Sequence, residues 1–226
     1  MLSSCAGLVT VDSNIIRLVH YTTQEYFQRH SLKRFEDVQS DIIATSCLTY
    51  LSYDVFAEGY LKELEMRSRL RHNPFFEYAA QNWAYHIEDT RQNVDDLALR
   101  FLMDDKKASA SSQVLFEYPP QKFCGTHLVA YFGLNDIMVR LLKEKEPDTK
   151  DSRGWTPLSY AVKRLNTWSV ELLLNYNVDL NSACKMKWTP FTRAIEGGSA
   201  AVVKAFLARG VEIDKGYELV RISNHM

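Results

Sequence analysis

The amino-acid sequence predicts a mainly all-α protein, in which a small N-terminal β-hairpin and a helical domain precede a solenoid of helical repeats. A tetrapeptide that recurs at a fixed distance in the second half of the chain predicts the solenoid. Apolar residues spaced three to four apart between residues 35 and 103 predict the helical domain. Two β-branched runs on either side of a turn predict the hairpin.

The clearest internal repeat is Trp155-Thr156-Pro157-Leu158, which returns as Trp188-Thr189-Pro190-Phe191 after 33 residues. Downstream apolar positions keep this register, as Val170 and Val203 show. A weaker copy begins at Cys124 and keeps a histidine, a glycine and a leucine pair. The copies predict three helical units, which we expect at residues 124–155, 156–188 and 189–214, and a partial cap at 215–226.

The repeated residue types have structural causes. Thr156 and Thr189 can cap the first helix of a unit, and the prolines that follow them suit its first turn. Leucine pairs at the end of a unit supply the apolar face of its second helix, which is buried only when a neighbouring unit stacks on it. Asn177 and Gly210 can end that second helix in a left-handed conformation. The pattern therefore predicts stacked helix pairs joined by projecting hairpin tips.

A period near 33 residues with a Thr-Pro-Leu start is typical of ankyrin repeats. The second half of the chain resembles that family over residues 121–214, regularly in the last two units and in degenerate form in the first. The resemblance implies a solenoid whose concave surface binds another protein.

The first half begins with a hairpin signal, because β-branched runs within residues 8–19 flank the turn-forming trio Asp12-Ser13-Asn14. Thr22 or Thr23 can cap a helix after it. Further along, aromatic and small residues four apart predict a core-facing helix stripe. The stripe consists of Phe75, Ala79, Trp83 and Ile87, with Phe76, Ala80 and His86 beside it.

Two polar stretches interrupt the apolar pattern. The charged run at residues 61–71 mixes both signs, which is more typical of a solvated helix face than of a basic binding site. Residues 106–112 are small and polar, and we expect a domain boundary there, with a linker over residues 108–120.

Several blocks of the first half resemble the segment that precedes ankyrin repeats in fungal NACHT-type, NOD-like signal-transduction ATPases. The blocks are CAGLV at 5–9, IIRLVHYTTQEYF at 15–27, CLTYLS at 47–52, NPF at 73–75 and YAAQNW at 78–83. The resemblance implies that residues 1–30 are the end of a winged-helix domain of the GPI inositol-deacylase type, that residues 31–107 are a helical linker domain, and that residues 121–226 hold the repeats. No GxxxxGK[ST] phosphate loop is present in the sequence. The resemblance therefore implies a C-terminal fragment or a short paralogue without the ATPase switch.

The composition excludes several classes of function. The chain has 226 residues and a net charge of −1, so it lacks the basic field that binds nucleic acids or anionic membranes. Its four cysteines show no zinc spacing, and we assign the single CxxH pair, Cys124 and His127, to a repeat position. The sequence contains neither a signal peptide nor an apolar segment of about 18 residues. We therefore expect a cytoplasmic protein with reduced thiols and no membrane or nucleic-acid partner.

No motif for catalysis is present, since GxSxG, HExxH and Gly-rich phosphate loops are all missing. We expect no enzyme activity, no catalytic residue, no cofactor and no metal. The sequence predicts a monomeric protein–protein interaction module with a protein partner. One alternative is a part of a nucleotide-dependent STAND ATPase whose NTPase domain lies outside this chain, and another is a nucleic-acid binder that uses the winged-helix remnant.

The predicted hairpin tips carry the candidate partner-binding residues. These are Lys150, Arg153, Trp155, Lys185, Lys187 and Trp188. The two tryptophans allow two interpretations. They can cover the backbone of adjacent repeats, or they can contact a partner, because tryptophan is enriched in interface hot spots.

Overall fold

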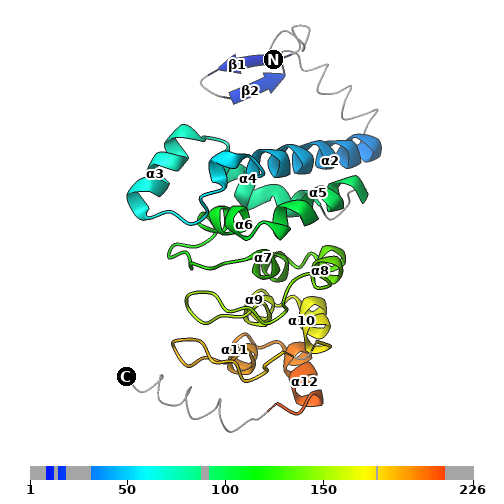
Figure 1. The fold of residues 1–226 in the computed structure, drawn as a ribbon. Coiled ribbons are helices and arrows are strands. Elements are labelled where there is room, and N and C mark those ends of the chain that lie inside the picture. Colours follow the sequence, from blue (N-terminus) through cyan, green and yellow to red (C-terminus); the bar gives the residue numbers. More distant parts are fainter. Residues whose placement is uncertain (1–8, 13–14, 19–31, 88–91, 177, 212–226) are drawn as a thin grey trace.

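The computed structural model describes residues 9–12, 15–18, 32–87, 92–176 and 178–211 (Figure 1). Near the N-terminus, β1 (Val9–Asp12) and β2 (Ile15–Leu18) pair antiparallel, with Val9 opposite Leu18. This confirms the predicted hairpin. The helix expected after Thr22 or Thr23 and the cap at 215–226 lie outside the described residues, and the assignment of residues 1–30 to a winged-helix domain stays a prediction.

The helices of the first half surround an aromatic core. They are α2 (Leu32–Leu51), η2 (Asp54–Phe56), α3 (Glu63–His72), α4 (Phe76–Asn82), η3 (Trp83–His86), α5 (Gln92–Met103) and α6 (Asp105–Ser112). Phe56, Phe76, Trp83 and Phe101 are fully buried or nearly so. The Trp83 ring meets Phe101 edge to face, with ring centres 5.5 Å apart.

The predicted aromatic stripe is buried at three of its four positions: Ala79, Trp83 and Ile87 lie in the core. Phe75 is the exception, since its side chain is 37% exposed, and Phe76 takes the core position instead. The reason is that α4 begins only at Phe76 and continues into the 3₁₀ turn η3, so the chain does not keep one 3.6-residue period over the whole stretch.

The linker expected over residues 108–120 is wrong for residues 108–112. This stretch belongs to α6, where residues 108–112 are all buried. Asp104 caps the helix by accepting hydrogen bonds from the backbone N–H groups of Lys106, at 3.0 Å, and Lys107, at 3.2 Å. Alanine and serine are small enough to let α6 pack closely against α4 and against the first repeat. The composition that suggested a flexible connection therefore serves close packing.

The charged run of residues 61–71 is largely exposed on α3, as expected, but Arg69 is 6% exposed. Its Nη1 donates to the carbonyl oxygen of Gly59 at 2.9 Å and to Oε1 of Gln113 at 3.3 Å. The guanidinium group also lies 5.7 Å from the centre of the Phe76 ring. Arg69 thus connects α3 with the segment after α6.

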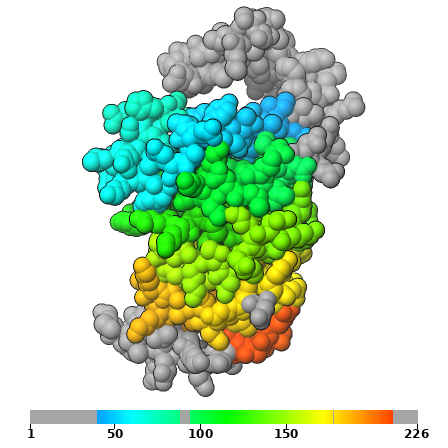
Figure 2. All heavy atoms as spheres, in the orientation of Figure 1, coloured from blue at the N-terminus to red at the C-terminus, as the bar shows by residue number. Residues whose placement is uncertain are grey.

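The second half is a stack of three helix pairs, as predicted (Figure 1). The first helices of the pairs are α7 (Gly125–Phe132), α9 (Pro157–Lys163) and α11 (Pro190–Glu196), and the second helices are α8 (Asn135–Leu141), α10 (Thr167–Leu174) and α12 (Ala200–Ala208). Thr156 accepts from the N–H of Ser159 at 3.3 Å, and Thr189 accepts from that of Thr192 at 3.2 Å. The predicted threonine caps are therefore confirmed. Figure 2 shows the helical half and the repeats as one continuous body, in which the colours follow each other along its length.

One turn position distinguishes the middle repeat from its neighbours. Gly133, Leu165 and Gly198 join the two helices of successive units, and their φ angles are 77°, 57° and 69°. A leucine in this left-handed region costs roughly 1 kcal/mol relative to glycine. We expect Leu165→Gly to raise the free energy of unfolding by about 0.5–1 kcal/mol, measured by urea denaturation. The matched control is Gly198→Ala, whose Cβ would enter open space and whose effect should have the opposite sign.

Candidate functional site

The hairpin between α8 and α9 is organised by the buried carboxylate of Asp151. One carboxylate oxygen accepts hydrogen bonds from the backbone N–H groups of Arg153, at 2.8 Å, and Trp155, at 2.9 Å. The other accepts from the hydroxyl group of Tyr160 on α9, at 2.6 Å. Burial, together with this hydrogen bond, raises the pKa of the Tyr160 hydroxyl, so the phenol remains protonated. The hairpin is therefore fixed to the helix that follows it.

Successive hairpins are also joined by their backbones. The N–H of Lys185 in the hairpin before α11 donates to the carbonyl oxygen of Arg153 at 2.9 Å. On the other side, the N–H of Ser152 donates to the carbonyl oxygen of Gln121 at 2.8 Å. These bonds tie the neighbouring segments into a row that projects beside α7, α9 and α11 (Figure 1).

Three cationic groups converge on the ring of Trp155. The guanidinium carbon of Arg193 lies 4.2 Å from the ring centre, and the Arg153 guanidinium carbon and the Lys163 ammonium nitrogen each lie at 5.4 Å. Two further rings extend the cluster. Phe116 lies 5.5 Å from Arg153 and 5.7 Å from Lys163, and Trp188 lies 5.5 Å from Arg193. We call these six residues the cationic–aromatic surface.

The surface has little negative charge to balance its cations. Arg193 lies 3.7 Å from the carboxylate of Glu196, and Arg153 lies 3.7 Å from that of Asp151. In the part of the chain that the structure describes, no carboxylate forms an ion pair with Lys163. Partial burial lowers the pKa of the Lys163 ammonium group, and repulsion from the guanidinium groups of Arg153, Arg193 and Arg164 lowers it further.

A stack of paired helices with projecting hairpins and Thr-Pro caps agrees with the comparison to known families. A family profile described as "Ankyrin repeats (3 copies)" matches residues 126–216. This part of the chain consists of ankyrin repeats. No protein of curated function matches the chain. Ankyrin repeats are protein–protein interaction modules that present an extended concave surface, and the resemblance of the first half to NACHT-type proteins stays a prediction.

The ankyrin geometry brings together three of the six predicted binding residues, namely Arg153, Trp155 and Trp188. Trp155 is 8% exposed, so its buried ring supports the cations and matches the interpretation in which it covers the repeats. Phe116, Lys163 and Arg193 were not among the predicted binding residues. Lys163 and Arg193 each follow a Trp-Thr-Pro start, on the first helix of a repeat, and this placement after the tryptophans was the available signal.

Among the described residues, the cation–π contacts of this cluster come from Arg153, Lys163 and Arg193 and not from the other three predicted binding residues. Lys150, Lys185 and Lys187 are exposed on the hairpins that precede α9 and α11. Lys187 has a φ angle of 64°, in the left-handed region, at the turn where its N–H donates to the carbonyl oxygen of Cys184 at 2.8 Å. Lys185 adjoins the cationic–aromatic surface through its backbone, because its N–H donates to the carbonyl oxygen of Arg153 at 2.9 Å.

Cys124 and His127 form a buried polar cluster at the start of the first repeat. The thiol lies 2.9 Å from both His127 Nδ1 and Thr126 Oγ1, and Nε2 of His127 lies 3.1 Å from the carbonyl oxygen of Trp155. Burial opposes ionisation of the thiol, but its hydrogen bonds outweigh burial and lower the pKa of Cys124. Among the described residues, no group of three potential ligands could hold a metal ion. The pair takes the place of the Thr156–Ser159 cap, so it caps α7 and links it to the next repeat.

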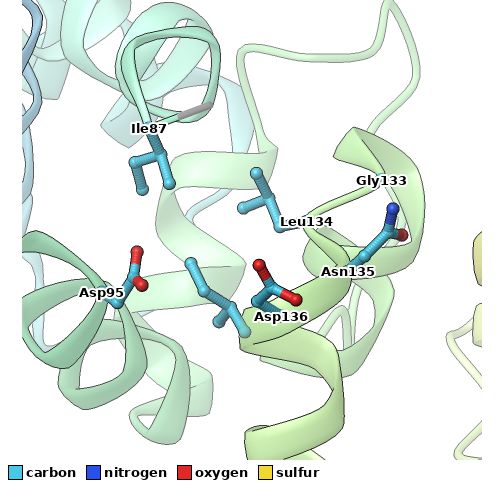
Figure 3. Close-up of a pocket in the computed structure, with 7 residues that line it drawn as sticks. Ile87, Asp95, Gly133, Leu134, Asn135 and Asp136 are labelled. Carbon is cyan, nitrogen blue, oxygen red and sulfur yellow. The ribbon is translucent and has the colours of Figure 1, made fainter. Parts of the chain in front are cut away.

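A pocket of about 380 Å³ lies where the helical half meets the repeats (Figure 3). Asp95 of α5 and Asp136 of α8 face it from opposite sides, and Ile87 and Leu134 line its apolar part. Burial raises the pKa of Asp95, and the charge of Arg140 acts in the opposite direction.

Proposed function

We propose that this chain is a non-catalytic module that holds a protein partner on the hairpins and first helices of residues 148–193. The observation that supports the proposal is the row of hydrogen-bonded hairpins, which presents exposed lysines beside the cationic–aromatic surface. Rigid hairpins lower the conformational entropy lost on binding, which favours affinity. The buried thiol and imidazole of Cys124 and His127 cap α7, and this structural role supports a non-catalytic module.

A pull-down tests the position of the binding site. The variant Lys185→Glu/Lys187→Glu reverses two exposed charges on one hairpin tip, and it should lose proteins that the wild type retains. The control Lys143→Glu/Lys204→Glu makes the same change in net charge at exposed positions elsewhere on the repeats, and it should retain them. The thermal unfolding midpoints of all three proteins should agree. Equal retention by both variants would remove the hairpin tips from the binding site.

A more specific role is a second candidate. The resemblance of residues 5–9, 15–27 and 47–52 to NACHT-type proteins supports a sensor segment of a nucleotide-dependent STAND ATPase, whose NTPase domain would be encoded outside this chain. Genomic sequence upstream of Met1 tests this candidate, because an in-frame GxxxxGK[ST] loop is required. A stop codon between any such loop and Met1 would argue for the stand-alone module.

We also propose a cytoplasmic location. Cys47, Cys124 and Cys184 are buried free thiols, and such thiols are typical of reducing compartments. Among the described residues, no helix is long and apolar enough to cross a membrane.

A further inference from the structure

The cationic–aromatic surface concentrates positive charge on one side of the ankyrin stack. Arg153 comes from a hairpin, Lys163 from the end of α9 and Arg193 from α11, so three segments contribute one cation each. The Trp155 ring holds them at distances of 4.2 to 5.4 Å from its centre. Like charges this close repel each other, and cation–π attraction to the shared ring offsets part of that repulsion.

These cations remain accessible to a partner. The Arg153 side chain is 36% exposed and that of Arg193 is 22% exposed, while Lys163 is exposed and has no ion-pair partner among the described residues. The Asp151 carboxylate is buried and already accepts three hydrogen bonds, so it cannot neutralise the outer faces of the cations. Among the described residues, Glu196 is the other acid that forms an ion pair with these cations, and it meets Arg193 only at 3.7 Å. The surface therefore has donors for additional carboxylates.

The central ring of this surface, Trp155, does not form a stacking platform for nucleic-acid bases. Trp155 is 8% exposed, and its ring already carries Arg193 at 4.2 Å. Proteins that bind single strands need free aromatic faces on which bases stack, in addition to positive charge. An acidic protein segment fits the surface better, because carboxylates need the guanidinium edges rather than the rings.

We propose that the cationic–aromatic surface binds a partner segment rich in Asp and Glu, with carboxylates placed between Arg153, Lys163 and Arg193. The inference rests on the proposed function, since it names the chemistry of the partner at the same face. A guanidinium group offers a planar pair of N–H donors to a carboxylate, and Lys163 adds a point charge between the two arginines. Binding of an acidic segment also relieves the mutual repulsion of the three cations, so affinity should fall as ionic strength rises.

A titration with a fluorescein-labelled oligoglutamate peptide tests the inference, with fluorescence anisotropy as the readout. The wild type should bind the peptide saturably, and Lys163→Glu/Arg193→Glu should weaken binding by at least about tenfold. The control Lys143→Glu/Lys204→Glu has the same net charge, and its affinity should stay within about twofold of the wild type. Circular dichroism and thermal unfolding establish that the variants are folded. No binding by the wild type, or equal binding by both variants, would overturn the inference.

Two further arms separate the alternatives. Labelled oligothymidylate should bind more weakly than oligoglutamate, and tighter binding that Lys163→Glu/Arg193→Glu abolishes would identify a nucleic-acid surface instead. A random-peptide display selection on the wild type should recover acid-rich peptides. The alternative outcome is that the selected peptides lack an excess of Asp and Glu and need Lys185 and Lys187 for binding. That outcome would overturn the acidic-partner inference and leave the proposed function in place. If no peptide is recovered and oligoglutamate does not bind, both proposals fail.

Discussion

Replacing Gly125 with alanine is expected to lower the free energy of unfolding by about 3 kcal/mol, which is a large effect for one added methyl group. Gly125 begins α7, and a Cβ atom there would lie 2.0 Å from the carbonyl oxygen of Leu102 in α5 and 2.8 Å from its carbonyl carbon. Backbone atoms cannot rotate away as a flexible side chain does. The two helices must therefore separate at the junction between the helical half and the ankyrin repeats.

Urea denaturation followed by circular dichroism measures this effect. The control is Gly197→Ala, whose Cβ would meet Leu165 Cδ2 at 3.2 Å and the carbonyl oxygen of Arg193 at 3.3 Å, so its neighbours need to shift far less than at Gly125. The wild type should unfold in one transition, because one hydrophobic core runs through both halves. Gly125→Ala should broaden this transition or split it. A loss below about 0.5 kcal/mol would contradict the close contact between α5 and α7.

Close packing at this junction also explains why a linker was predicted where the structure has helix α6. The sequence shows a small, polar stretch at residues 106–112, and composition alone cannot distinguish a flexible linker from a helix that packs at short distance. The decisive partners lie far away in sequence, since α6 packs against α4 and α7. Repeats are predictable because their partners recur locally, at one fixed spacing. The junction between the halves cannot be predicted in this way, because it depends on a close approach of backbone atoms of Leu102 and Gly125, and no repeat or apolar periodicity in the sequence indicates that approach.

The residues of the cationic–aromatic surface also differ in whether the sequence predicts them. The repeated tryptophans mark Arg153, Trp155 and Trp188, because each lies in or next to the repeated tetrapeptide. Phe116 joins them only through the folded stack, since it belongs to the segment after α6 and its ring lies 5.7 Å from the Lys163 ammonium group at the end of α9. Exposed lysines at the hairpin tips were predicted from position alone.

Replacing Asp151 with alanine is expected to destabilise the protein by about 3–4 kcal/mol, because one buried carboxylate serves three donors. The change leaves the N–H groups of Arg153 and Trp155 and the hydroxyl of Tyr160 without their acceptor. A buried donor without a partner costs about 1–3 kcal/mol. Tyr160 is fully buried, although its hydroxyl still meets the Arg153 guanidinium group at 2.7 Å.

Two companion variants show whether the loss comes from these hydrogen bonds. Asp151→Asn keeps an oxygen acceptor for the two N–H groups, so it should cost about half as much as alanine. Asp179→Ala removes an exposed carboxylate that, among the described residues, accepts one side-chain hydrogen bond, from the N–H of Asn181 at 3.0 Å, and it should cost less than about 1 kcal/mol. Equal effects of all three changes would mean that the hairpin does not depend on the buried carboxylate. Asp151 also accepts hydrogen bonds from the N–H groups of Arg153 and Trp155, which belong to the cationic–aromatic surface. Oligoglutamate binding should therefore weaken in Asp151→Ala and stay unchanged in Asp179→Ala. This result would show that the stability of the hairpin determines where the surface places its positive charge.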